Sequence, residues 1–304
     1  MRLLIMSLFF SLFNVLVTAQ EISTPYLGQK APGLRPEVFA PGIISTKASE
    51  FGLAISPGAT EFYFSRSLSV SVMAIMVVKY VNGEWTNAET VSFSGKNYDM
   101  DPSFSCDGKK IFFGSTRPNG NVNASGCDIW ITEKSETGNW SNPYLACKKI
   151  NTTGDDNFPC VACNGTLYFF SKKHKGFGGT DIFKSEFVDG KYSTPENLGE
   201  AINSRYNESD AYIAPDESYI IFNSERKNDS FGNGDLYISF RKDDGTWTDA
   251  INMGSEVNSK NIDYAPKVSP DGKYFFFSSY RKNNGNIYWM DAAIIDKLRE
   301  EVFK

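Results

Sequence analysis

The stretch VSPDGKYFFFSSYR, residues 268–281, predicts a β-hairpin and decides the fold of the whole chain. Pro270 presets its own φ for a turn, Asp271 can hydrogen-bond nearby backbone, and Gly272 tolerates a positive φ. The return strand YFFFSS is aromatic, which is typical of a strand that is buried on both faces. The pattern occurs five times along the chain, so this hairpin is one copy of a repeated unit.

Each repeat combines a turn, an aromatic second strand and a third strand. The turns lie at 56–59 (SPGA), 105–108 (SCDG), 162–165 (ACNG), 214–217 (APDE) and 269–272 (SPDG). The third strands begin at Asp128, Asp181, Asp235 and Asn286, with Ala74 in the corresponding place of the first unit. A fourth strand follows a glycine turn and starts at an aromatic residue: Trp85, Trp140, Tyr192 and Trp247. A period of about 50 to 57 residues matches one four-stranded propeller blade.

The fifth repeat lacks a fourth strand, and residues near the N-terminus supply a match for it. Residues 36–45 (PEVFAPGIIS) resemble the segment 195–204 (PENLGEAINS) that joins two repeats. We therefore predict an all-β fold, a propeller of five four-stranded blades closed by pairing the two ends of the chain, with six blades as the alternative. The predicted propeller spans 36–290, with repeats near 50–93, 101–147, 156–198, 208–253 and 262–290.

The remaining segments lie outside the repeats. Residues 20–35 form a Gly/Pro-rich leader, and residues 291–304 have a helical pattern in which Asp291 is a candidate N-cap. Ile294, Ile295, Leu298 and Val302 fall near one face of that helix. Residues 1–19 combine Arg2, an apolar run and small residues before a cleavage site, which predicts a signal peptide with an uncleaved N-terminal anchor as the alternative. Export to the periplasm or the extracellular space follows, with no transmembrane segment after cleavage.

Composition and cysteine content narrow the function further. The net charge of −5 argues against nucleic acid or an anionic membrane as the main partner. The five cysteines are Cys106, Cys127, Cys147, Cys160 and Cys163. An exported protein can form at most two bridges from them, and the sequence leaves the pairing open. The C-x-x-C spacing of Cys160 and Cys163 lacks a second ligand pair, so we predict no metal site there.

The motifs SPDGKYFFFSS, DNFPCVACNGTLYFFS and GFGGTDIF followed by PENLGEAINS resemble the TolB-like, WD-repeat-like (PD-type) β-propeller repeats of exported bacterial proteins. The resemblance covers essentially the whole mature chain. It implies a periplasmic or cell-surface propeller, often a module that binds a protein or a glycan. TolB has six blades and an additional N-terminal domain, and this chain has neither, so the partners of TolB are not carried over.

Two columns of charged residues emerge when the repeats are aligned on their turns. Seven residues before the Pro/Cys position of each turn lies a carboxylate: Glu50, Asp99, Asp156, Glu208 and Asp263. The second strand ends near a cation: Arg66, Arg117, Lys173, Arg226 and Arg281. In an antiparallel hairpin these two positions share one face of the disc. The columns are either acid–base pairs that hold the blades together or a charged ring that binds a ligand at the channel mouth.

Other candidates carry weaker signals. Asp128, Asp181 and Asp235 are short carboxylates after glycine or cysteine loops, expected to accept backbone N–H bonds. We predict no cofactor, with calcium over residues 151–157 (NTTGDDN) as the alternative. The single histidine, His174, lies among lysines in a loop expected to be solvated. Long loops at 118–126, 172–180 and 227–234 lie on the same face as the carboxylates and differ between repeats, so a binding surface is expected there.

No catalytic residues are predicted, because no serine-hydrolase elbow, P-loop or dinucleotide fingerprint is present. The primary functional prediction is an exported, non-catalytic propeller that binds a protein partner or a cell-envelope glycan through its loop face. The alternative is a carbohydrate-active enzyme, a glycoside hydrolase or lyase, that uses carboxylates at the channel mouth. A purely structural component of an array is the third interpretation. The oligomeric state is not predicted.

Overall fold

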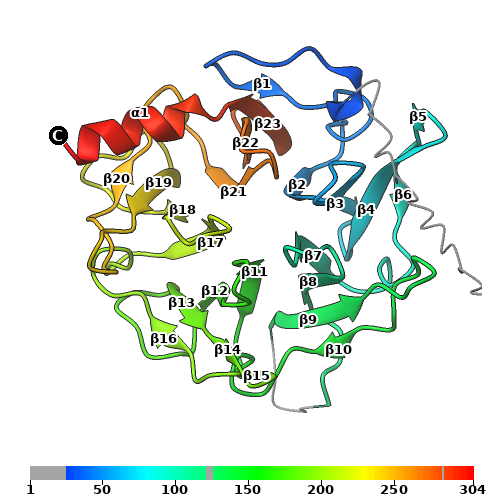
Figure 1. Ribbon diagram of the computed structural model, residues 1–304, viewed down its shortest axis with the longest axis horizontal. Helices are drawn as coiled ribbons and strands as arrows, with labels where there is room; N and C mark the ends of the chain where they lie inside the picture. The colour runs from blue at the N-terminus through cyan, green and yellow to red at the C-terminus, as the bar shows by residue number, and fades with distance from the viewer. Residues whose placement is uncertain (1–24, 121–125, 283) are drawn as a thin grey trace, which may run out of the picture.

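The computed structural model describes residues 25–120, 126–282 and 284–304, and five sheets form a ring around one central axis (Figure 1). The predicted signal peptide, the start of the leader and the middle of the 118–126 loop lie outside the described residues. The prediction of a β-propeller with five four-stranded blades is confirmed, and the six-blade alternative is wrong.

Blades 1 to 4 run from the central axis to the rim in the order of the sequence, and blade 5 takes its outermost strand from the N-terminal end of the chain. The innermost strands are β2 (Glu50–Ile55), β7 (Asp99–Phe104), β11 (Asp156–Val161), β17 (Glu208–Ile213) and β21 (Asp263–Val268). The second strands are β3 (Glu61–Ser69), β8 (Lys110–Ser115), β12 (Leu167–Ser171), β18 (Tyr219–Ser224) and β22 (Tyr274–Ser279). Successive innermost strands contact one another around the axis, so these strands line the channel.

The outer half of each blade contains a third strand about as long as the second and a fourth strand of two residues. The third strands are β4 (Val72–Val81), β9 (Asp128–Glu133), β13 (Asp181–Ser185), β19 (Asp235–Phe240) and β23 (Asn286–Asp291). The fourth strands are β6 (Glu89–Thr90), β10 (Tyr144–Leu145), β16 (Glu196–Asn197), β20 (Ile251–Asn252) and β1 (Glu37–Val38). Short pieces at the outer turns, β5 (Glu84–Trp85), β14 (Phe187–Val188) and β15 (Lys191–Tyr192), complete the strands.

The two ends of the propeller pair as predicted. Strand β1 lies antiparallel to β23, with Glu37 opposite Trp289 and Val38 opposite Tyr288. The N–H of Phe39 continues the ladder to the carbonyl of Ile287 at 2.8 Å. Blade 5 is therefore built from both ends of the ring, and its outer edge is covered.

The turn after each innermost strand explains the repeated sequence. Its last residue has a positive φ in every copy: 51° at Ala59, 69° at Gly108, 90° at Gly165, 60° at Glu217 and 73° at Gly272. Glycine adopts this conformation without steric cost, which is why three copies use it. The aromatic strands that follow are buried, and their side chains form the core between adjacent blades.

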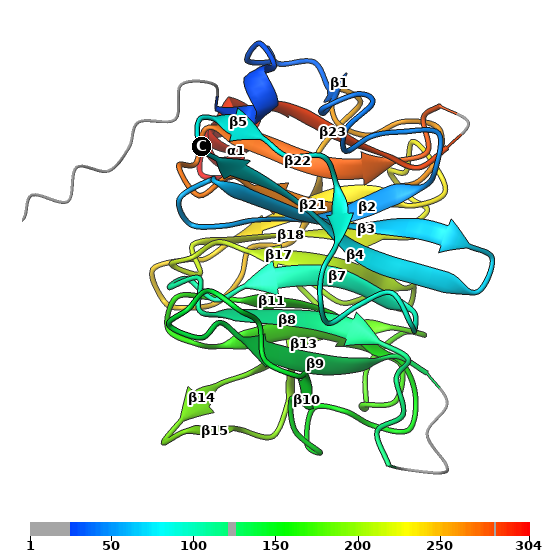
Figure 2. The same cartoon turned by 90° about the vertical axis from the view of Figure 1, so that its right-hand side faces the viewer.

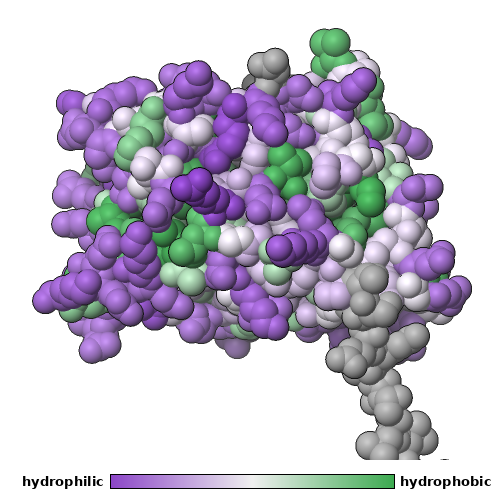
Figure 3. Space-filling model, turned by 90° about the horizontal axis from the view of Figure 1, so that it is seen from above, coloured by the Kyte–Doolittle hydropathy of each residue, from purple (hydrophilic) through white to green (hydrophobic). Residues whose placement is uncertain are grey.

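The disc has two distinct faces (Figure 2). The β3–β4 hairpin extends from the face on which the innermost strands begin, here called the loop face. The β14–β15 hairpin extends from the opposite face, here called the turn face because the repeated turns lie there. Seen edge-on from above, the rim is largely hydrophilic, and its hydrophobic residues form separate small patches (Figure 3).

A C-terminal helix, α1 (Ala293–Val302), packs on blades 4 and 5 through Ile294, Ile295 and Leu298. It begins two residues after Asp291, whose carboxylate accepts a hydrogen bond from the N–H of Ala293 at 2.9 Å. No helix in the described part of the chain has the length and apolarity needed to span a bilayer.

One disulfide joins neighbouring blades. Cys106 and Cys163 occupy equivalent positions in the turns of blades 2 and 3, and their Cα atoms are 5.2 Å apart. Cys127 and Cys160 are free and buried, and Cys147 is free and partly exposed. The bridge resolves the pairing that the sequence left open.

Candidate functional site

The five column carboxylates lie at the first position of the innermost strands, and all are fully buried. Their exposed fraction is 0% in every blade: Glu50, Asp99, Asp156, Glu208 and Asp263. Burying an ionised carboxylate is costly unless it is paired and hydrogen-bonded. The partners of these groups therefore decide what the column does.

Four of the carboxylates pair with the arginine of their own hairpin. The N–O distances are 2.9 Å for Arg66–Glu50, 2.7 Å for Arg117–Asp99, 3.4 Å for Arg226–Glu208 and 2.8 Å for Arg281–Asp263. Each guanidinium also donates to a backbone carbonyl of the segment that enters its blade: Ile44, Phe93, Ile202 and Val257. The arginine thus ties the hairpin to the inter-blade segment.

The arginines are also covered by aromatic rings. Arg117 lies over Phe113 and Trp130, with the guanidinium carbon 4.9 and 5.3 Å from the ring centres. Arg281 lies over Phe277 and Tyr288 at 5.0 and 4.9 Å. Stacking on rings and a bidentate fork suit arginine better than lysine. The geometry fits the interpretation of the columns as links within and between blades, and a binding role for these residues stays a prediction.

Blade 3 departs from this arrangement. The sequence pairs Lys173 with Asp156, but among the described residues Lys173 makes no ion pair, and its aliphatic stem lies against Gly154. His174 takes the place of the arginine, with Nε2 3.0 Å from the carbonyl oxygen of Ile150. Its ring packs against Phe169 and Phe183, so the prediction of a solvated loop histidine is wrong.

A second set of residues, which the sequence analysis missed, lies two positions after the carboxylates. Each adopts a positive φ: 62° at Gly52, 54° at Asp101, 51° at Phe158, 50° at Asp210 and 50° at Ala265. The ladder to the second strand shifts register there, which marks a β-bulge in every blade. A Cβ atom on Gly52 would lie 2.6 Å from Asp101 Oδ1 and 3.2 Å from the Cα of Asp101, so the close approach of blade 2 favours glycine in that copy.

Two of the five bulge residues are carboxylates, and neither has an ion-pair partner in the described part of the chain. Asp101 is 7% exposed; its Oδ2 accepts a hydrogen bond from Asn157 at 3.1 Å, and its Oδ1 has none. Burial and the charge of Asp210 raise the pKa of Asp101 well above its usual range. Burial also raises the pKa of Asp210 to about 7. At neutral pH these two groups do not both carry a full charge.

The channel beside Asp101 is narrow. The cavity at this level, between blades 1, 2, 3 and 5, has a volume of about 10 Å³. That is barely room for one water molecule. Asp101 is therefore shielded from large ligands, whereas Asp210 is partly exposed.

The loop face opens into a hollow of about 760 Å³ over blades 2, 3 and 4. Its lining is rich in hydrogen-bonding side chains: Thr116, Asp155, Asn157, Asn207, Ser209 and Glu225. Asn157 and Ser209 directly follow the column carboxylates, and Phe51 and Tyr264 hold the same position in blades 1 and 5. The Phe51 and Tyr264 ring centres are 6.0 Å apart, and Tyr264 stacks on Tyr280 at 5.9 Å. These aromatic residues of blades 1 and 5 lie outside the lining of the hollow, at the level of its Asn157 and Ser209.

Two of the predicted loops contribute to the lining of this hollow, 118–126 through Gly126 and 172–180 through Lys172, Gly179 and Thr180, and 227–234 does not. The third-strand aspartates hold the described parts of these loops. Asp181 accepts hydrogen bonds from the N–H groups of Phe177 and Gly178, and Asp235 accepts them from Phe231 and Gly232. Asp128 instead accepts from the side chain of Asn119 at 2.6 Å. The loops of blades 3 and 4 are thus closed by the hydrogen bonds expected of these carboxylates.

The stretch 151–157, where calcium is the alternative prediction, uses its carboxylates internally. Asp155 pairs with Lys172 at 2.5 Å, and Asp156 accepts from the hydroxyl of Thr152 at 2.7 Å. Among the described residues no three His, Cys, Asp or Glu side chains gather as a metal site would require. Calcium binding there remains an untested prediction.

Comparison with solved structures identifies proteins that have a similar fold. TolB from Acinetobacter baumannii matches with a TM-score of 0.51 and 17% identity, over 81% of this chain and 53% of the TolB chain. A glycoside hydrolase matches with a TM-score of 0.58 and 10% identity, over 91% and 96% of the two chains. An α-L-arabinofuranosidase from Lactobacillus brevis matches with a TM-score of 0.54 and 11% identity, over 80% and 90%.

The chain therefore has a TolB-like β-propeller fold and spans about half the length of the Acinetobacter TolB. No family model and no curated protein matches the sequence. Identities this low show the fold alone, so function has to be argued from the sites of this chain.

Proposed function

We propose that this protein is an exported, non-catalytic binding module that holds a cell-envelope glycan in the loop-face hollow. The observation that carries the proposal is the composition of the channel mouth. Amide, hydroxyl and carboxylate groups of blades 2 to 4 line the hollow, and the Phe51, Tyr264 and Tyr280 rings gather outside it, on blades 1 and 5 of the same face. A sugar offers hydroxyl groups to the first set and an apolar ring face to the second.

Export is supported by two features of the chain. Residues 1–19 have the pattern of a signal peptide. The Cys106–Cys163 bridge suits an oxidising compartment such as the periplasm or the extracellular space. An epitope-tagged full-length protein, fractionated into cytoplasm, periplasm and medium, is expected outside the cytoplasm, and residence in the cytoplasm would overturn this part of the proposal.

Binding is tested with glycan arrays of cell-envelope polysaccharides, followed by calorimetric titration of the hits. Tyr280→Ala and Glu225→Ala change the aromatic group and the polar lining of the hollow, respectively, and each is expected to weaken binding at least tenfold. Phe303→Ala removes another exposed ring, 54% exposed on the C-terminal segment, and should leave affinity unchanged. Binding that is insensitive to both mouth variants would contradict the proposal. Capture of an envelope protein in pull-downs, lost in the same variants, would identify a protein as the ligand instead.

Glycoside hydrolysis is the second candidate function, and the observation that favours it is the pair Asp101 and Asp210. Neither carboxylate pairs with an arginine of the described residues, and their raised pKa values suit an acid that keeps its proton near neutral pH. The narrow channel beside Asp101 limits access and weighs against this function. Hydrolysis of polysaccharides or aryl glycosides that is abolished in Asp210→Asn, with glycan binding retained, would establish the enzyme. No turnover by the unmodified protein supports the binding module.

A further inference from the structure

A large apolar group lies at four of the five junctions between blades at the turn face. Beside it, the junction of blades 1 and 2 keeps a cleft of about 550 Å³, lined by the turns of both blades and by the ion pair of Glu61 with Lys134. The outer-turn tryptophans of blades 1, 2 and 4 belong to apolar clusters that span adjacent blades: Trp85, Trp140 and Trp247. Trp140, for example, donates from Nε1 to the hydroxyl of Tyr63 in blade 1 at 3.1 Å. Helix α1 covers the junction of blades 4 and 5. The junction of blades 2 and 3 is built differently.

At that junction the corresponding residues are replaced. Tyr192 stands where blades 1, 2 and 4 have tryptophan. Phe187 is its cross-strand partner, whereas Lys134 is the cross-strand partner of Trp140 in blade 2. Lys134 also bridges to Glu61 of blade 1 at 3.0 Å. At the junction of blades 2 and 3 the equivalent positions are occupied by Lys110 and Phe187, which cannot form an ion pair. The junction thus lacks both the indole ring and the ion pair.

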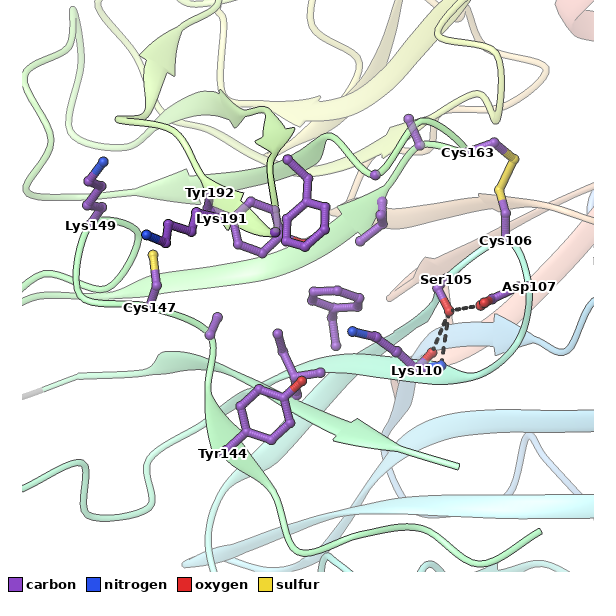
Figure 4. Close-up of a pocket in the computed structure, with 18 of the residues that line it drawn as sticks. Ser105, Cys106, Asp107, Lys110, Tyr144, Cys147, Lys149, Cys163, Lys191 and Tyr192 are labelled. Atoms are coloured by element: carbon purple, nitrogen blue, oxygen red, sulfur yellow. Dashed lines mark hydrogen bonds between the residues drawn. A yellow bond between two sulfur atoms is a disulfide. The ribbon is translucent and has the colours of Figure 1, made fainter. Parts of the chain in front are cut away.

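A cleft of about 700 Å³ lies between blades 2 and 3. Its walls are mainly apolar and aromatic, with contributions from Phe112, Ile131, Val161, Phe187 and Tyr192. Figure 4 shows the Cys106–Cys163 bridge at one end and Cys147, Lys149 and Lys191 at the other. A cleft of this size and lining matches those that bind small organic molecules. The cleft is separate from the loop-face hollow, because its lining includes the turns of the opposite face.

The charge of the cleft is opposite to that of the protein. Four lysines line it, together with one aspartate, Asp107, whereas the whole chain carries −5. Asp107 is occupied by the hydroxyl of Ser105 at 2.6 Å, and Lys110 pairs with Glu133 at 2.9 Å. The other three lysines are exposed and form no ion pair within the described structure: Lys148, Lys149 and Lys191. Uncompensated cations beside an apolar wall favour an anion with an apolar body.

We propose that the cleft between blades 2 and 3 is a second ligand site, which takes a small organic anion with a flat apolar body, such as an aromatic carboxylate or sulfonate. The flat body lies between Phe112 and Tyr192, and the anionic group faces Lys148, Lys149 and Lys191. The disulfide joins the turns of both blades at the inner end and keeps the two walls at a constant separation. This site is independent of the glycan proposed for the loop face.

The test uses 1-anilinonaphthalene-8-sulfonate, a fluorescent aromatic sulfonate, as the probe with the intact, oxidised protein. The unmodified protein is expected to bind one equivalent with enhanced fluorescence. The triple variant Lys148→Ala/Lys149→Ala/Lys191→Ala should raise the dissociation constant at least tenfold. The matched control, Lys242→Ala/Lys260→Ala/Lys282→Ala, removes three exposed lysines of blades 4 and 5 and should bind like the unmodified protein. Equal weakening in both triple variants would overturn the proposal.

Two further measurements locate the probe. Tyr192→Trp introduces the larger ring that blades 1, 2 and 4 have at this position and is expected to abolish binding without loss of thermal stability. Cys147 is the one partly exposed free thiol of the described chain, so bound probe should slow its alkylation by iodoacetamide severalfold. Binding that survives Tyr192→Trp, or that leaves the alkylation rate of Cys147 unchanged, places the probe elsewhere and overturns the proposal even if a lysine variant folds poorly.

Discussion

His174 takes, beside Asp156, the place that an arginine takes beside the carboxylate of the other four blades. It follows Asp156 by 18 residues, and Arg117 follows Asp99 by the same interval. His174 Nε2 contacts the carbonyl of Ile150 at 3.0 Å, the link that Arg117 makes to Phe93 at the same distance. Within the described structure, however, no ion pair reaches Asp156, and burial raises the pKa of that carboxyl. Blade 3 lacks one interaction that its neighbours have.

We expect His174→Arg to stabilise the protein by about 1–3 kcal/mol, because a charge-assisted hydrogen bond would reach a buried carboxylate. Phe169 and Phe183 already flank the position, as aromatic residues flank the other arginines. The free energy of unfolding in urea measures the effect. Lys173→Arg, one residue earlier, is the matched control and should change it little. Stabilisation by the control alone would show that the register assigned to blade 3 is wrong.

Arg281→Ala should lower the free energy of unfolding by about 3–5 kcal/mol, because Asp263 would remain buried without its partner. Lys297→Ala breaks an exposed pair with Glu256, 55% and 54% exposed, and should cost less than about 1 kcal/mol. Guanidinium unfolding followed by tryptophan fluorescence compares the two variants. If Arg281→Ala costs no more than Lys297→Ala, the arginine column is not structural, and a binding role for it gains weight.

Stability should fall as the pH rises from about 5 to about 8. The pKa of Asp210 is 3.8 in an exposed carboxyl and rises to about 7 in the folded protein, so over this range the folded state keeps a proton that the unfolded state has lost. Deprotonation then penalises the folded state. Carboxyls with lowered pKa values, such as Asp107 and Asp216, act below about pH 4 and do not mask the effect.

The measurement is the melting temperature at pH 5 and pH 8. Asp210→Asn should reduce the difference between them, because the amide does not titrate and the charge that acts on Asp101 is removed. An unchanged pH dependence in this variant would contradict the assignment of the raised pKa to the pair at the bulges.

Replacing both bridged cysteines, Cys106→Ser/Cys163→Ser, should lower the free energy of unfolding by about 4 kcal/mol, the loop-closure estimate for a separation of 57 residues. Cys147→Ser lies in the same cleft outside the bridge and should have little effect. The double variant should also bind the aromatic sulfonate more weakly, since the cleft walls are no longer joined. Retention of both stability and affinity would show that the bridge is dispensable.

The architecture could be read from the sequence because turn chemistry and aromatic strands are local signals that recur in every blade. The pairing of residues 36–45 with blade 5 followed from a match to segment 195–204, and β1 occupies that place. The carboxylates and their arginines were found in the same way. Lys173 was assigned in place of His174 because the turn of blade 3 is one residue shorter, so Lys173 follows the end of its second strand by two residues, as Arg117 does. Counting from the turn instead of from the strand end leads to His174.

The bulge carboxylates and the cleft could not be read from the sequence. Asp101 and Asp210 share their column with glycine, phenylalanine and alanine, so the repeat carries no chemical signal there. Their position in the channel depends on a register shift that only the backbone reveals. Tyr192, which stands where blades 1, 2 and 4 have tryptophan, lines the cleft. That difference is visible in the aligned repeats, but its effect depends on how blades 2 and 3 approach each other.

The pairing of Glu37 with Trp289 has a consequence for the order of folding. Strand β1 is synthesised before the four blades that separate it from its partner β23, and the two pair across 252 positions of sequence. Blades 1 to 4 are built from contacts within one repeat and can form as each repeat emerges. Blade 5 cannot form until β23 has emerged, so closure of the ring is the last event of folding. A pulse-labelling hydrogen-exchange experiment should therefore find the amides of β1 and Phe39 protected later than those of β7 and β8.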